Sequence, residues 1–306
     1  AAYAAFDGGF YKIFVQDLQT KKTKQVGKGG FRSDQYPFDR SYPILTWTKS
    51  GHKLAVISEK KDVIRLKQID LDKKTTTKNN IIKFQKIYAA DFTNNPNMLV
   101  VSGQNKGQTD LYLYNTANST STQLNNDHFD DLSPVYVNWN GNDAILFSSN
   151  RTEDKLQMDR ADTLLPTQTL DLFYYDLNKR GNDLARVTET PFANEKAIGT
   201  YDDTYYTFLS DENGISNQYA GTLDSFYVGK DSVEVILNED SDSARMVKTE
   251  VDVYKWKGFT FPITNFSRGI QQAGVSRQNS YFFFGANKRK TYLYAKKNIQ
   301  EEELKR

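Results

Sequence analysis

Few residues in this chain could carry out chemistry. The sequence contains no cysteine, which excludes disulfides, thiolate nucleophiles and cysteine-ligated zinc or iron–sulfur sites. Its two histidines, His52 and His128, are 76 positions apart, so they cannot form the paired helix motif of zinc metallopeptidases. No Gly-x-Ser-x-Gly sequence supplies the nucleophile elbow of an α/β hydrolase. The sequence therefore predicts no catalytic residue, no metal and no cofactor.

Two clusters of acidic residues are the remaining candidates for a metal site. One contains Asp127, Asp130 and Asp131 beside His128, and the other contains Glu239, Asp240 and Asp242. Neither has the Gly and the closing Glu of a calcium-binding EF-hand loop, and His128 has no second imidazole nearby for a transition metal. We expect these acids to lie in solvated loops.

Composition narrows the protein class further. The chain has 306 residues, of which 38% are hydrophobic and 13% aromatic, and so many large rings predict an ordered core. The net charge of +2 is too balanced to favour nucleic-acid binding. No stretch approaches the roughly 18 uncharged apolar residues of a membrane-spanning helix, so no such span is expected in this chain.

A repeated pattern of short strands predicts the fold. Five apolar runs of strand length each end in a small residue: 54–58, 98–102, 144–148, 206–210 and 281–285. Each follows a turn and a partner strand: 44–47, 87–92, 134–139, 197–201 and 272–275. Third strands with alternating aromatic residues follow, as at 110–115, 171–176 and 291–294, and then short fourth strands such as 121–124. The pattern indicates a repeating unit of four strands.

The period identifies the unit as a propeller blade. The serines that end successive second strands, Ser58, Ser102 and Ser148, are 44 and 46 residues apart, which is the blade period of a β-propeller. Longer later gaps indicate hydrophilic insertions at about 151–169 and 224–252. Residues 11–17 and 23–26 supply the outer strands of a first blade. We predict an all-β propeller of about six four-stranded blades over residues 1–298, with incomplete first and last blades and a charged tail at 299–306. A β-sandwich or two smaller sheets are the alternative.

One blade also resembles a known family. The segment 131–151 combines a Ser-Pro start, Trp139 at the end of the first strand, a turn at Gly141 and an exit through Ser149 and Arg151. With the strands that follow at 171–177 and 186–188, it resembles the TolB-type WD-like repeat, and 44–58 is a weaker match. The resemblance implies a secreted or envelope-facing propeller that binds partners without catalysis. The Asn-rich and Tyr-rich composition is also similar to propeller segments of larger Bacteroidetes envelope proteins.

Loops that join consecutive blades gather on one face of a propeller, where partners commonly bind. Four such loops, near 31–40, 125–131, 190–195 and 265–268, mix aromatic and charged residues of the kinds that anchor interfaces. The candidate partner-binding residues are Arg32, Asp34, Tyr36, Phe38, Arg40, His128, Phe129, Asp130, Phe192, Glu195, Phe266 and Arg268. The alternative for the four Phe rings among them is that they fill gaps between blades.

The resemblance, together with the lack of catalytic motifs, implies a non-catalytic, protein-binding platform in the bacterial cell envelope, periplasmic or associated with the outer membrane. Its expected partners are envelope proteins of a multi-subunit, membrane-associated complex. Two alternatives stay open. One is an accessory propeller of a larger hydrolase whose catalytic domain lies outside this chain, and the other is a carbohydrate-binding propeller.

Overall fold

The structure is a computed structural model. It describes the chain apart from residues 8–9, 18, 31–38, 40, 140, 159–165, 180, 203, 240–242, 277–280, 289–290 and 299–306, and for the strands within 233–247 and 276–298 it describes the backbone alone. The described residues form strands and no helix, so none of them belongs to a helix that could cross a membrane.

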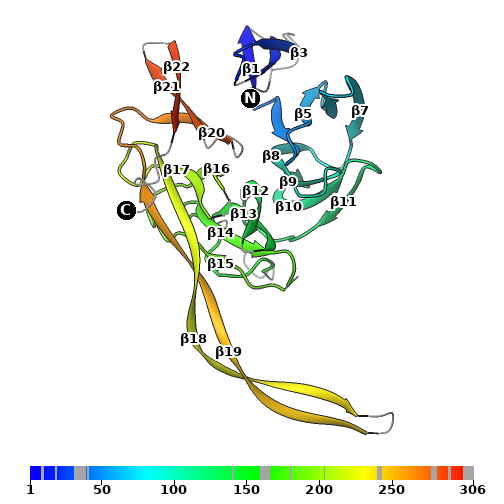
Figure 1. The fold of residues 1–306 in the computed structure, drawn as a ribbon, viewed down its shortest axis with the longest axis vertical. Coiled ribbons are helices and arrows are strands. Elements are labelled where there is room, and N and C mark those ends of the chain that lie inside the picture. The colour runs from blue at the N-terminus through cyan, green and yellow to red at the C-terminus, as the bar shows by residue number, and fades with distance from the viewer. Residues whose placement is uncertain are drawn as a thin grey trace.

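Twenty-two strands form six antiparallel sheets, each built from strands that are consecutive in the chain (Figure 1). Blade 1 contains β1 (Ala2–Asp7), β2 (Phe10–Gln16) and β3 (Thr23–Gly30). Blade 2 contains β4 (Ile44–Trp47), β5 (Lys53–Lys60), β6 (Val63–Asp70) and β7 (Thr75–Ile81). Blade 3 contains β8 (Lys86–Phe92), β9 (Met98–Asn105), β10 (Gln108–Asn115) and β11 (Thr120–Gln123).

The second half of the chain continues the series. Blade 4 contains β12 (Asp131–Trp139), β13 (Asn142–Ser149), β14 (Asp171–Asp176) and β15 (Ala185–Arg186). Blade 5 contains β16 (Lys196–Thr200), β17 (Tyr206–Ser210), β18 (Asn217–Glu239) and β19 (Ser243–Pro262). Blade 6 contains β20 (Ile270–Ser276), β21 (Tyr281–Lys288) and β22 (Thr291–Asn298). The predicted all-β propeller, with incomplete first and last blades, is confirmed.

Hydrophobic packing explains why the second strand of each blade reads as an unbroken apolar run. In β5, Leu54 and Val56 face blade 1, whereas Ala55 and Ile57 face blade 3. Because both faces of the strand are covered, alternation with polar residues is absent. The buried residues form one cluster at each of the five boundaries between consecutive blades. The hydrophobic effect therefore acts mainly between blades.

The first strands of the blades surround a central cavity. Its volume is about 870 Å³, and each of the six first strands contributes to its lining, through Ala2, Thr46, Ala90, Val135, Ile198 and Gly274. The Lys49 ammonium group lies 2.7 Å from Asp91, and Asp91 also accepts hydrogen bonds from Thr46 and from the backbone N–H of Tyr136. Asp91 thus ties three consecutive blades together at the cavity wall.

The structure adds two features to the sequence-based expectation, one in blade 1 and one in blade 5. The chain start contributes a third strand to blade 1, because β1 pairs with β2 from Ala2 to Asp7. Residues 224–239 and 243–252, within the segment predicted as a hydrophilic insertion, lie in β18 and β19, which pair out to Glu239 and Ser243 with one register shift between Tyr227 and Gly229. Among the described strands, no pairing joins blade 1 to blade 6.

Candidate functional site: a face built from the loops between blades

Four described loops between consecutive blades form what we call the loop face: residues 82–85, 124–130, 187–195 and 263–269. Alternating strand direction brings each of them beside the connection between the second and third strands of a neighbouring blade. The Asn194 N–H, for example, donates to Asp211 at 2.6 Å, and Gln157 exchanges two hydrogen bonds with the backbone of Asn126. The loops are held in place from both sides.

A buried ion pair supports the loop between blades 3 and 4. The Arg151 guanidinium donates to both carboxylate oxygens of Asp131, at 2.6 and 2.8 Å, and neither side chain is exposed. The Phe129 ring lies against the same guanidinium, with 5.6 Å between the ring centroid and Cζ. Asn125 links this pair to blade 3, since it donates to Asp131 and accepts from the Leu111 N–H. The ion pair of Arg151 with Asp131 in blade 4 is therefore connected to blade 3 through Asn125.

The expectation of solvated loop acids is wrong for two members of the first acidic cluster. Asp127 and Asp131 are completely buried, whereas Asp130 is exposed. Burial raises the pKa of Asp131, and the neighbouring Arg151 opposes that rise. Burial, and then the negative charge of Asp131, raises the pKa of Asp110 to about 7. The second cluster contains Glu239, whose side chain is not described, and Asp240 and Asp242, which lie outside the described residues.

A second buried network supports the loop between blades 4 and 5. Glu195 is 1% exposed and accepts hydrogen bonds from Thr188 and Thr190, at 2.8 and 2.6 Å. Asp171 accepts from the Thr190 N–H on the same loop. Burial raises the pKa of Glu195 to about 7. As a correction to the predicted surface role, Glu195 points into the protein and shapes the loop.

The Phe residues of the loop face divide between the two roles considered from the sequence. Phe129 is 4% exposed and fills the gap between blades, beside Arg151. Phe192 is 94% exposed and Phe266 is 38% exposed. The Phe266 backbone N–H donates to Asn217 at 2.8 Å, which holds this loop against β18. Phe192 and Phe266 are thus presented to solvent by anchored loops.

The other predicted residues are distributed as follows. His128 is half-buried, and its ring lies tilted against that of Phe129 with 4.2 Å between ring centroids, while Asp130 and Arg268 are exposed. Arg32, Asp34, Tyr36, Phe38 and Arg40 lie outside the described residues. Sequence reasoning missed Ile82, which is 91% exposed in the loop between blades 2 and 3. The sequence feature that could have identified Ile82 is its position directly after a fourth strand, where a loop between blades begins.

Among the described residues, no three acidic or histidine side chains converge as metal ligands. The buried carboxylates are already occupied by Arg151, by threonine hydroxyls or by backbone N–H groups. The described part of the loop face therefore offers apolar side chains for contact with a partner, and exposed charges at Asp130 and Arg268 lie on the same face.

Comparisons with known proteins agree on the architecture. No protein-family model and no curated protein sequence matches the chain. A putative TolB from Agrobacterium tumefaciens matches with a TM-score of 0.57 and 11% identity, over 95% of this chain and 80% of that protein. TolB from Acinetobacter baumannii matches with a TM-score of 0.53 and 12% identity, over 72% of this chain and 48% of that protein, so the matched region is about half of the longer molecule.

The fold also occurs in an enzyme. An oligogalacturonate lyase in complex with manganese matches with a TM-score of 0.51 and 11% identity, over 99% of this chain and 75% of that protein. At such low identity these matches establish the fold alone, which is a TolB-like β-propeller, and the fold by itself does not distinguish binding from catalysis.

Proposed function

We propose that this TolB-like β-propeller is a non-catalytic platform that binds a protein partner through its loop face, within a bacterial cell-envelope assembly. The observation that carries the proposal is the exposure of Ile82, Phe192 and Phe266 on three loops of one face. Exposed aromatic and large aliphatic side chains are costly in water and are the usual anchors of protein interfaces.

The rigidity of the loops supports the same role. Glu195 accepts from the Thr190 hydroxyl within the loop between blades 4 and 5, and Asn217 of β18 accepts from the Phe266 N–H. Asn125 ties its own loop to blade 3 by accepting from the Leu111 N–H. A surface that is ordered before binding loses less conformational entropy when the partner arrives. The buried networks thus make the apolar side chains of the face better anchors.

The envelope location rests on similarity. The blade at 131–190 resembles the TolB-type repeat in sequence, and two TolB proteins share the architecture. We place the chain in the periplasm or at the outer membrane, as the propeller segment of a larger Bacteroidetes envelope protein. Its partners are then subunits of a membrane-associated complex.

The burial and the hydrogen bonds of the acidic side chains support a binding role without catalysis. Asp110, Asp131 and Glu195, whose raised pKa values would suit acid–base chemistry, are each at most 1% exposed and hydrogen-bonded within the protein. A substrate could not reach them without separation of two blades.

Affinity capture from the native envelope tests the proposal. The wild-type protein is compared with the triple variant Ile82→Ser, Phe192→Ser, Phe266→Ser, and with the control Tyr3→Ser, which alters an exposed ring on β1, toward the end of blade 1 opposite to Gly30. We expect the control to retain an envelope partner that the triple variant loses. Equal recovery by all three proteins would contradict a role of the loop face, and stabilisation by a saccharide in place of protein capture would favour the carbohydrate-binding alternative.

A further inference from the structure

One loop of the loop face ends on a buried acid that has no cation bound to it. Loop 187–195 presents the Phe192 ring, which is 94% exposed, and closes on Glu195, which is 1% exposed. None of the ion pairs among the described residues includes Glu195. A carboxylate charge is costly to bury without water or a cation, so some other group must neutralise this one.

The boundary between blades 3 and 4 shows what is missing. There the acid at the start of the first strand is Asp131, and the Arg151 guanidinium binds both of its carboxylate oxygens. At the boundary between blades 4 and 5, Arg186 donates to Asp171 at 3.1 Å. Among the described residues, no guanidinium binds Glu195, which lies just before β16. Similar places in two blades therefore hold an acid with a cation and an acid without one.

Two threonine hydroxyls bridge Glu195 and Asp171. The Thr188 hydroxyl oxygen lies 2.8 Å from Glu195 and 3.4 Å from Asp171. The Thr190 hydroxyl oxygen lies 2.6 Å from Glu195 and 3.2 Å from Asp171. A hydroxyl has one proton and can donate it to one carboxylate at a time. Two ionised carboxylates would therefore compete for two hydroxyl protons, whereas a proton on Glu195 adds the missing donor.

The other charged groups nearby do not balance a negative charge on Glu195. Arg186 is already bound to Asp171 and Asp154, and Lys196, the next residue in the chain, is exposed to solvent. The other titratable groups on the described elements around Glu195 are Tyr206 on β17, Tyr219 on β18, and Asp211 and Glu212 in the turn that follows β17. None of these four side chains is a cation.

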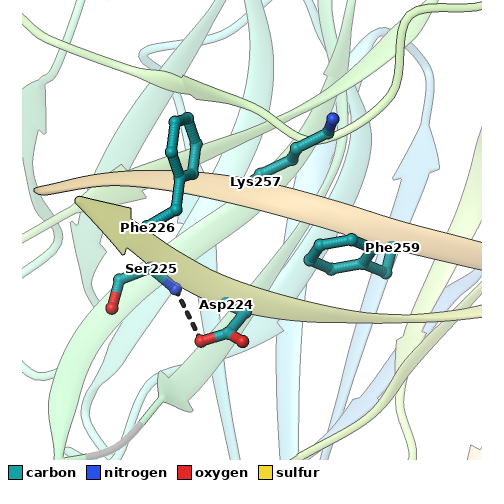
Figure 2. A pocket seen from close by; sticks show the side chains of 5 residues that line it. All are labelled: Asp224, Ser225, Phe226, Lys257 and Phe259. Atoms are coloured by element: carbon teal, nitrogen blue, oxygen red, sulfur yellow. Dashed lines mark hydrogen bonds between the residues drawn. The ribbon is translucent and has the colours of Figure 1, made fainter. Parts of the chain in front are cut away.

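The hollows of the propeller lie elsewhere. The central cavity is lined by Ala197 but by neither Glu195 nor Asp171. A shallow hollow of about 220 Å³ on the β18–β19 ribbon lies beside Phe226 and Phe259 and includes neither carboxyl (Figure 2). The burial of Glu195 and the position of these hollows therefore favour a proton over a bound ligand as the neutralising group.

A proton on Glu195 makes the closed loop depend on pH. Burial raises the pKa of Glu195 to about 7, the threonine hydrogen bonds oppose the rise, and the charge of Asp171 adds to it. In a loop that has opened to water, the same carboxyl titrates near its ordinary value of about 4.3. Between these two pH values, opening releases a proton to the solvent. The open fraction therefore rises with pH by up to about tenfold per pH unit and levels off above about pH 7.

The segment that carries Phe192 lies between two residues of this network. The Ala193 N–H donates to the Thr190 carbonyl at 3.2 Å, and the Glu195 N–H donates to the Leu170 carbonyl at 2.9 Å. The order of the segment therefore depends on Thr190 and Glu195, which also hold the proton.

We propose that loop 187–195 is a pH-dependent element of the loop face: a proton on Glu195 holds the loop against Asp171, and loss of that proton releases the loop together with the Phe192 ring. The consequence for binding rests on the proposed function. It is that a partner bound through Phe192 is held more tightly at pH 5 than at pH 8.

Hydrogen–deuterium exchange of the whole chain from pH 5 to pH 8.5, read at single residues, tests the proposal. The amides of Thr190, Ala193 and Asn194 are hydrogen-bonded in the closed loop, and each rate is divided by the intrinsic rate of that amide at the same pH. We expect their protection to fall by up to about tenfold per pH unit between pH 5 and pH 7 and to stay constant above pH 7.5.

The reference is the Phe266 amide, in a loop held by the neutral side chain of Asn217. Its protection should change much less over the same range. Equal declines at Thr190 and Phe266, or constant protection at Thr190, would overturn the proposal.

Two glutamate variants identify the titrating group. Glu195→Gln keeps the shape of the side chain and resembles its neutral form, so protection of the Thr190 amide should become independent of pH. The matched control Glu189→Gln removes an exposed carboxyl from the same loop and should follow the wild type. The same decline in Glu195→Gln as in the wild type would contradict the assignment. If Glu195→Gln does not fold, the comparison of Thr190 with Phe266 in the wild type still decides the proposal.

The exchange measurement needs no partner, so its outcome is separate from that of the affinity capture. A captured partner together with a loop of constant protection would overturn this inference alone. A pH-dependent loop without a captured partner would support the inference about the loop and contradict the proposed function.

Discussion

Arg151, just after the β12–β13 hairpin, binds Asp131 at the start of the same hairpin, with both carboxylate oxygens within 2.8 Å of one guanidinium nitrogen and both side chains fully buried. The guanidinium also donates to the carbonyls of Lys155 and Leu156, so it fastens the start of the connection that follows β13. One cation thus neutralises a buried acidic pocket and orders the loop around it.

Removal of this cation should be costly. Arg151→Met leaves Asp131 buried beside Asp127 without a counter-charge, and breaking a buried pair in this way costs about 3–5 kcal/mol. Urea denaturation should report a loss of that size. The matched control is Lys230→Met, which breaks the exposed pair with Glu250 and should cost at most about 1 kcal/mol. Similar small losses for both variants would contradict the role of Arg151.

Stability should fall as pH rises toward neutrality. Burial raises the pKa values of Asp110 and Glu195 to about 7, while the same groups in an unfolded chain titrate near pH 4. Between about pH 4 and pH 7 the folded state holds protons that the unfolded state has lost. The free energy of unfolding therefore decreases with pH in this window, by at most about 1.4 kcal/mol per pH unit for each group, and levels off above it.

Neutral variants isolate the contribution of these two carboxyls. Asp110→Asn combined with Glu195→Gln removes both titrations and should flatten the decline between pH 5 and pH 7, measured as urea midpoints at several pH values. If wild type and double variant decline with the same slope, other groups cause the pH dependence.

The base of the long β18–β19 ribbon depends on a close approach between the backbone of β19 and the backbone that follows β15. A Cβ atom at Gly258 would lie 2.2 Å from the Val187 carbonyl oxygen, where β19 crosses the end of β15. Gly258→Ala should therefore destabilise the protein by about 1–3 kcal/mol. The control Gly274→Ala meets open space at an ordinary backbone conformation and should be tolerated. Equal melting temperatures for the two variants would contradict this packing.

Charge reversals on the loop face should separate binding from folding. Asp130→Lys with Arg268→Glu changes exposed side chains and should weaken partner capture while the free energy of unfolding changes by less than about 0.5 kcal/mol. Glu195→Lys places an unpaired charge in a buried network and should cost at least about 3 kcal/mol. A folded Glu195→Lys variant of normal stability would show that this residue is not buried.

The propeller was predictable because its signal is periodic. The second strands are covered on both faces, so each reads as a short apolar run, and the blade period spaces these runs evenly. Serines at their ends recur for a physical reason: Ser102 donates to the Asp131 carbonyl at the first strand of the next blade, and Ser210 donates to Glu195 just before the first strand of its own blade. The period of the sequence therefore reflects packing and hydrogen bonds that recur in the structure.

Other features depend on three-dimensional context that a single sequence does not display. β8, β12, β16 and β20 each contain a bulge in the pairing with the second strand of their blade, as between Leu132 and Val135. Asp131 and Glu195 resemble ordinary loop acids until Arg151 and the threonines are placed around them. Residues 224–252 read as an insertion because they lengthen one unit beyond the repeat period, and only the pairing of β18 with β19 reveals that most of them continue two strands.

The most direct test of the central claim is photo-crosslinking in the native cells, with a photoreactive phenylalanine analogue placed at position 192. We predict an adduct with an envelope protein at this position and at positions 82 and 266, and none at position 3 on blade 1. No adduct at the three loop positions, or an equal adduct at position 3, would contradict the assignment of the loop face as the binding surface.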